Sequence, residues 1–115
     1  MLRSATLNRV EQQLEFHQLA FDDLDRVDEI LASLDGQLDW LVGADLLYCN
    51  EGCWSDLFCL IRHVLTSVPE CRGMLMAYEA RTLTSIGLHV ARFGLAAKLL
   101  CSETNVQLLH ITLAL

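Results

Sequence analysis

The 115-residue chain has few positive charges: eight Lys and Arg against fifteen Asp and Glu, for a net charge of −7. Proteins that bind nucleic acid contact its phosphates mainly through Lys and Arg, so this balance argues against a nucleic-acid partner. No uncharged apolar run reaches the roughly 18 residues of a membrane span. No basic segment followed by an apolar run opens the chain as a signal peptide would. We therefore expect a soluble protein without a membrane partner.

Glycine is also sparse, and its arrangement excludes one class of site. The six glycines stand apart from one another, at positions 36, 43, 52, 73, 87 and 94. A phosphate-binding loop needs several glycines in close succession, so the sequence shows no complete nucleotide or dinucleotide site. It also has no internal repeat, low-complexity tract or linker, which predicts a single domain over residues 1–115.

The five cysteines are odd in number and stand mostly in apolar segments, so no disulfide framework is predicted. We expect reduced, buried thiols in an intracellular protein, cytoplasmic or nuclear. Cys53, Cys59 and His63 would share one helix at spacings that do not gather three ligands on one side, so no metal site is predicted. His17, His89 and His110 are expected to be packed or surface residues, although a Cys and His nucleophilic pair stays open.

Hydrophobic periodicity and turn residues predict alternating strands and helices. Strands are predicted at 14–21, 38–44, 73–78, 95–102 and 106–115, and helices at 24–35, 53–66 and 82–93. Gly36 and Gly94 are expected to end two of the helices in the left-handed conformation. The order predicts an α/β fold of three layers, with helices on both faces of a mostly parallel sheet. Only the last two strands, joined by a short hairpin, are expected to be antiparallel.

Ligands of open parallel sheets bind beyond the carboxyl ends of the strands, so the residues at these ends are candidates for a site. They are Phe21, Asp22, Asp23, Ala44, Asp45, Tyr48, Tyr78, Glu79 and Arg81. Asp22 and Asp23 are better explained as caps of the following helix. Asp45 lies well before the next helix, so a functional and a structural role are equally open for it.

The segment "LDWLVGADLLY", residues 38–48, resembles the fourth strand and following motif of the seven-β-strand S-adenosylmethionine-dependent methyltransferases. The closest branch is that of the protein-lysine methyltransferases with an Asp/Glu-x-x-Tyr motif, which Asp45-Leu46-Leu47-Tyr48 matches. The later segments are similar to the family's fifth strand, last helix and terminal antiparallel pair. "LAF" at 19–21 is similar to its Leu-x-Trp segment, so the resemblance extends over residues 14–115.

The resemblance implies a Rossmann-like fold, S-adenosylmethionine as cofactor of the complete domain, and a protein substrate. It implies that Phe21 and Ala44 border the cofactor and that Asp45 and Tyr48 form the catalytic channel for a target lysine. Phe21 stands in place of the family's usual Trp. Methyl transfer from a sulfonium is an in-line displacement, so orientation of a neutral amine supplies much of the catalysis.

The family places a glycine-rich loop and a ribose-binding acid ahead of these elements, and this chain has neither. We therefore expect a partial methyltransferase domain, truncated on its N-terminal side, that is inactive by itself. An uncovered apolar sheet edge predicts self-association. The alternative is a noncatalytic α/β module that binds a protein partner through its sheet edge or methyltransferase-like surface.

Overall fold

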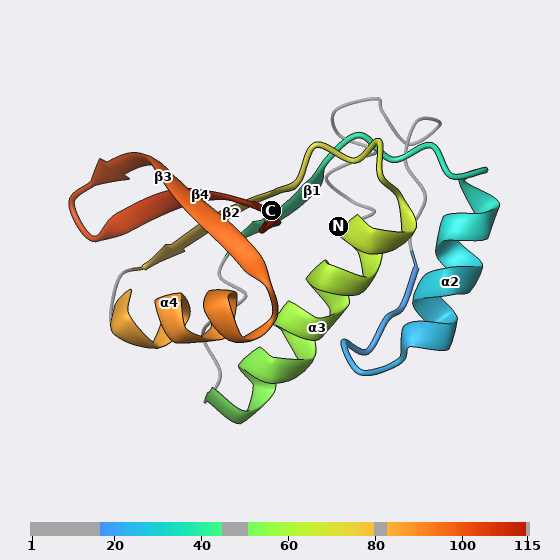
Figure 1. Ribbon diagram of the computed structural model, residues 1–115, viewed down its shortest axis with the longest axis horizontal. Coiled ribbons are helices and arrows are strands. Elements are labelled where there is room, and N and C mark those ends of the chain that lie inside the picture. Colours follow the sequence, from blue (N-terminus) through green and yellow to red (C-terminus); the bar gives the residue numbers. More distant parts are fainter. Residues whose placement is uncertain (1–16, 45–50, 80–82, 115) are drawn as a thin grey trace, which may run out of the picture.

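The computed structural model describes residues 17–44, 51–79 and 83–114, in which two helices pack against a four-stranded sheet and a third helix packs against one of these two (Figure 1). The helices are α2 (Leu24–Ser33), α3 (Glu51–Ser67) and α4 (Leu83–Arg92). The strands are β1 (Leu41–Ala44), β2 (Met74–Glu79), β3 (Leu95–Glu103) and β4 (Val106–Leu113). The predicted α/β class is confirmed.

The sheet is mixed, in the order β1-β2-β4-β3. β1 and β2 are parallel, and β3 and β4 form the predicted antiparallel hairpin. The expectation that only this last pair is antiparallel was wrong, because β4 is also antiparallel to β2. The hairpin turns back so that β4 lies between β2 and β3 and pairs with both. Two of the three strand pairings are therefore antiparallel.

Helices α3 and α4 cover one face of the sheet. Along β2 the side chains of Met74, Met76 and Tyr78 are buried, whereas those of Leu75 and Ala77 are only half-buried. Both α3 and α4 contribute to the core on the first of these faces. The largest side chains in it that are fully buried are those of Phe58, Ile61, Met76 and Ile111. The described residues thus form two layers, and the expected third layer is not seen among them.

A second, smaller cluster joins α2 to the outer side of α3. Val27 of α2 is buried with Leu60 and Val64 of α3, and Leu19 and Phe21 pack against them. The strand predicted over residues 14–21 is wrong for residues 17–21, which have no strand, while 14–16 lie outside the described residues. Leu19 and Phe21 are apolar because they pack against helices, a role that alternation alone does not distinguish from a strand.

Capping residues define the helix ends. The Asp23 side chain accepts a hydrogen bond from Arg26 N at 3.1 Å and caps α2, as the sequence predicted. Gly36 and Gly94 both have positive φ, at 70° and 67°, so the predicted left-handed glycines are confirmed. Arg62 Nη1 of α3 donates a hydrogen bond of 2.6 Å to Phe93 O, beyond the C-terminus of α4. A cation there also complements the negative end of the α4 dipole.

Candidate functional site

The carboxyl ends of β1 and β2 lie at the same edge of the sheet. The parallel register pairs Ala44, the last residue of β1, with Ala77 of β2. Ala44 is exposed. Asp45 and Tyr48, the residues expected to act on a substrate, follow directly in sequence but lie outside the described residues. The structure therefore places the end of the strand that leads into the motif, and not the motif itself.

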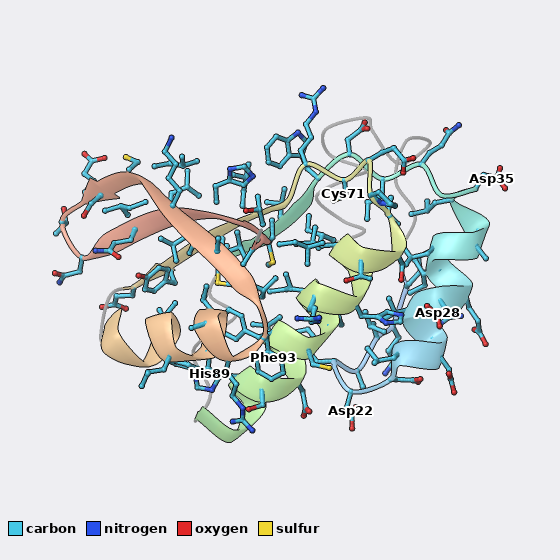
Figure 2. The ribbon with its side chains drawn as sticks, in the orientation of Figure 1. Asp22, Asp28, Asp35, Cys71, His89 and Phe93 are labelled. Atoms are coloured by element: carbon cyan, nitrogen blue, oxygen red, sulfur yellow. The ribbon has the colours of Figure 1, made fainter. Side chains whose placement is uncertain are left out.

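Phe21 was expected at the carboxyl end of a strand, but it does not end a strand of the sheet. Residues 17–20 have no regular secondary structure, and Phe21 and Asp22 form a turn before α2. Phe21 is half-buried and packs against both hydrophobic clusters, which does not fit an accessible wall for a cofactor. Figure 2 shows Asp22 beside the start of α2, pointing away from the sheet. The expected convergence of three strand ends on one rim was therefore wrong for the first of them.

Tyr78, one of the two tyrosines expected on that rim, faces the core. Its side chain is 2 % exposed, and its hydroxyl donates a hydrogen bond to Gln107 Oε1 at 2.5 Å. β2 and β4 position the pair, because their register places Tyr78 opposite Gln107. Glu79, the next residue, is exposed at the end of β2, and Arg81 lies outside the described residues. Tyr78 thus stabilises the sheet and is not available to a ligand.

This burial predicts a pH dependence of stability. Burial raises the pKa of the Tyr78 hydroxyl above its ordinary value of 10.0, because the ionised form would lose its hydration. The stabilisation is therefore complete below about pH 10 and is lost as pH rises through the raised pKa. We expect the free energy of unfolding to fall more steeply between pH 8 and pH 11 in the wild type than in Tyr78→Phe. Urea titrations at both pH values measure the difference, and parallel pH dependences would contradict this assignment.

A cavity among the described residues lies at the other end of the strands, where β2 begins. It has a volume of about 300 Å³ and lies between the end of α3, the start of β2 and the end of β4. Its lining residues are Leu65, Thr66, Pro69, Cys71, Arg72, Gly73, Thr112 and Leu113. The cavity is mostly apolar and contains one charged residue, Arg72. Its lining offers neither a carboxylate nor a histidine for proton transfer.

Contacts beside this cavity join segments that are distant in the chain. His110 Nε2 of β4 donates a hydrogen bond to Arg72 O at 2.7 Å, and its ring centroid is 5.2 Å from that of Trp40. Arg72 N donates to Asp39 O at 2.7 Å, which ties the start of β1 to the start of β2. Sequence reasoning missed these contacts because no local pattern marks partners separated by more than thirty residues. They explain His110 as a structural residue, as expected.

The other candidate side chains also have structural environments. His63 Nε2 donates a hydrogen bond to Asp28 Oδ1 at 2.7 Å, which links α3 to α2. The His89 ring lies near those of Trp54 and Phe58, with centroids 5.5 and 5.7 Å apart. Across the part of the chain that the structure describes, no His, Cys, Asp and Glu cluster could hold a metal ion.

The described cysteines differ from expectation in their burial. Cys59, Cys71 and Cys101 are free thiols. Cys59 and Cys101 are exposed and Cys71 is half-buried, so the prediction of buried thiols was wrong for these three. Apolar neighbours in sequence do not bury a residue on the solvent side of an amphipathic helix, where Cys59 lies.

The geometry of the site therefore consists of one defined strand end, at Ala44, with the residues of the motif beyond it.

Within residues 17–44, 51–79 and 83–114, no helix has the length and apolar character needed to cross a membrane. Comparison of the chain with protein-family models, with curated proteins and with solved structures finds no match.

Proposed function

We propose that the chain supplies the substrate side of an S-adenosylmethionine-dependent methyltransferase-like domain acting on protein lysine. The observation that carries the proposal is the position of Ala44. It ends a strand that is parallel to its neighbour, and the sequence Asp45-Leu46-Leu47-Tyr48 follows at once. Ligands of α/β sheets bind at such carboxyl ends. The succession of β2, α4 and the antiparallel β3–β4 pair also agrees with the resemblance.

The chemistry assigns a role to each residue of the motif. S-adenosylmethionine, when bound, supplies the methyl group. The Asp45 carboxylate would hold the incoming lysine ammonium and orient the amine once its proton has left, and Tyr48 would form a wall with a hydroxyl group. The exposure of Ala44 is compatible with a bound cofactor, whereas Phe21 packs against both hydrophobic clusters and is left out of the proposed site.

We expect Asp45→Asn to lower methyl transfer by about 100-fold, because an amide neither attracts the ammonium nor holds the amine in line with the methyl group. The measurement uses the chain expressed with any coding sequence that directly precedes it in its transcript. Radiolabelled S-adenosylmethionine reports transfer, and mass spectrometry identifies methyllysine. Tyr48→Phe tests the hydroxyl separately from the aromatic wall.

Asp22→Asn is the matched control, because Asp22 is an exposed carboxylate beside a helix start and outside the proposed site. It should transfer methyl groups at the wild-type rate. The proposal fails if the wild-type protein yields no methyllysine above a heat-denatured sample. It also fails if Asp45→Asn and Asp22→Asn are equally active.

A second function, a noncatalytic module that binds a protein partner, is favoured by another observation. The sheet face opposite the helices carries apolar side chains from three strands, Val42, Leu75, Ala77 and Leu108, and Val42 is 76 % exposed. Apolar surface of this kind on a folded domain often marks a binding site. Loss of methyl transfer with the sheet intact would favour this function.

A further inference from the structure

The two edge strands of the described sheet differ in how they are protected against pairing. β3 carries Lys98 and Glu103, and its register with β4 shifts between Leu99 and Cys101. Charged residues and bulges are the usual devices that prevent an edge strand from accepting another strand. β1 has the sequence Leu-Val-Gly-Ala, with no charge, no proline and no register shift in its pairing with β2. Of the two edges, β1 alone lacks these devices.

The backbone geometry of β1 shows which groups face the open edge. Leu41 N donates to Gly73 O at 3.0 Å, so the N–H of Leu41 points toward the chain that enters β2. Backbone groups of successive strand residues point to opposite sides. Gly43 therefore also faces β2, whereas Val42 and Ala44 direct their N–H and C=O groups outward. The edge presents two donors and two acceptors, spaced two residues apart.

We propose that β1 pairs with β1 of a second copy of this chain, antiparallel and about a two-fold axis, to form one continuous eight-stranded sheet. Val42 lies opposite the partner's Ala44, and Ala44 lies opposite the partner's Val42. Both are hydrogen-bonded pairs, so the two outward donors and acceptors of each copy are all used. A two-fold interface brings the same surface of each copy together, which this arrangement satisfies.

The side chains of β1 suit a second copy. The axis passes between the two Gly43 residues, which form the close, non-hydrogen-bonded pair at about 4.5 Å between Cα atoms and have no side chains to collide. Val42 and the partner's Ala44 form an apolar cross-strand pair, and no like charges face each other within the strands. A partner strand with charged or bulky residues at these positions would fit less well.

Size and charge set the strength of this association. Pairing of four residues buries less than the roughly 1,200 Å² of a standard stable interface, so we expect a dissociation constant of roughly 10–100 µM. Each copy carries a net charge of −7, so the two copies repel each other over long distance. Added salt screens this repulsion, so a higher salt concentration should strengthen the dimer.

Sedimentation velocity of the full chain from 5 to 500 µM tests the proposal, with two changes at one position. Val42→Pro removes the outward N–H and leaves the Leu41 hydrogen bond in place, so it should weaken dimerisation by at least tenfold. Val42→Lys should do the same by placing a charge on the paired edge. Val106→Lys is the matched control, because Val106 is a 53 % exposed strand valine outside β1. It makes the same change in net charge and should leave the dissociation constant within twofold.

Hydrogen exchange keeps the proposal testable if Val42→Pro does not fold. In the wild type, exchange at the Val42 and Ala44 amides should slow as protein concentration rises. A protein that is monomeric at 500 µM overturns the proposal. So does a dimer that survives Val42→Pro but not Val42→Lys, which would pack through the helix-free face. Protection of the Val42 amide that does not depend on concentration would place another segment of the chain on this edge, and it also overturns the proposal.

Discussion

Replacing Gly73 by alanine is expected to lower the free energy of unfolding by about 3 kcal/mol or more, from backbone strain and steric overlap together. Gly73 has φ of 126°, a conformation that residues with a side chain rarely adopt. A Cβ at this position would lie 2.5 Å from Ile111 O and 2.7 Å from His110 Nε2. Neither neighbour can move easily, because β4 is paired with β2 at Ile111 and the His110 ring is hydrogen-bonded to Arg72 O.

Gly87→Ala is the control for this prediction. Gly87 lies within α4, and a Cβ there would meet nothing within 4 Å. Alanine is the better helix former, so this change should be neutral or should stabilise the protein by about 0.5–1 kcal/mol. Urea unfolding followed by circular dichroism measures both variants. Equal midpoints for Gly73→Ala and the wild type would show that Gly73 is not constrained as the structure indicates.

Replacing Phe58 by alanine is expected to cost about 3–5 kcal/mol, the range for removing a fully buried aromatic side chain. Phe58 has no exposed surface and lies in the core that joins α3 to the sheet and to α4. The cavity left behind would also deprive the His89 ring of one of its aromatic neighbours. With a slope of about 1–1.5 kcal/mol per molar urea for a chain of this size, the midpoint should fall by about 2–5 M.

Leu88→Ala provides the comparison on the neighbouring helix. Leu88 of α4 is 68 % exposed, so its truncation should change stability by less than about 0.5 kcal/mol. A difference between the two variants of under 1 kcal/mol would contradict the placement of Phe58 at the centre of the core. It would also remove the support for α3 as the helix that holds the sheet.

The helices were predicted closely because their signals are local. Apolar residues recur at helical spacing over 24–35, and α2 occupies Leu24–Ser33 with Asp23 as its cap. The predicted helix over 82–93 corresponds to α4 at Leu83–Arg92, followed by the left-handed Gly94. Helical periodicity, capping and a terminal glycine all act within one or two turns of chain.

The strands were predicted less well because pairing depends on distant partners. Residues 17–21 alternate in a way that suits a strand, but Phe21 packs against α2 and α3 without joining the sheet. The hairpin of β3 and β4 was expected, since its turn is local. That β4, and not β3, lies next to β2 follows from the packing of Leu109 and Ile111 on the core under α3 and α4. No short-range pattern encodes that choice.

The candidate site was also predicted correctly in one part and wrongly in another. The sequence alone marked Ala44 as the end of a strand, and the structure agrees. It also placed Tyr78 on an open rim, where the structure shows a buried hydroxyl bonded to Gln107. Strand alternation indicates that Tyr78 and Glu79 face opposite sides, but it does not say which side the helices cover. The helices decide this by packing on the Met76 face.

For this protein, the sequence by itself determined the α/β class, the three described helices, the closing hairpin and the end of β1 at Ala44. Each depends on interactions between residues close together in the chain. The tertiary structure alone decided the strand order, the single helix-covered face, the environment of Tyr78 and the position of β1 at the edge of the described sheet. These depend on which apolar surfaces meet, and that is settled by long-range packing that buries the most apolar area and satisfies the most backbone groups.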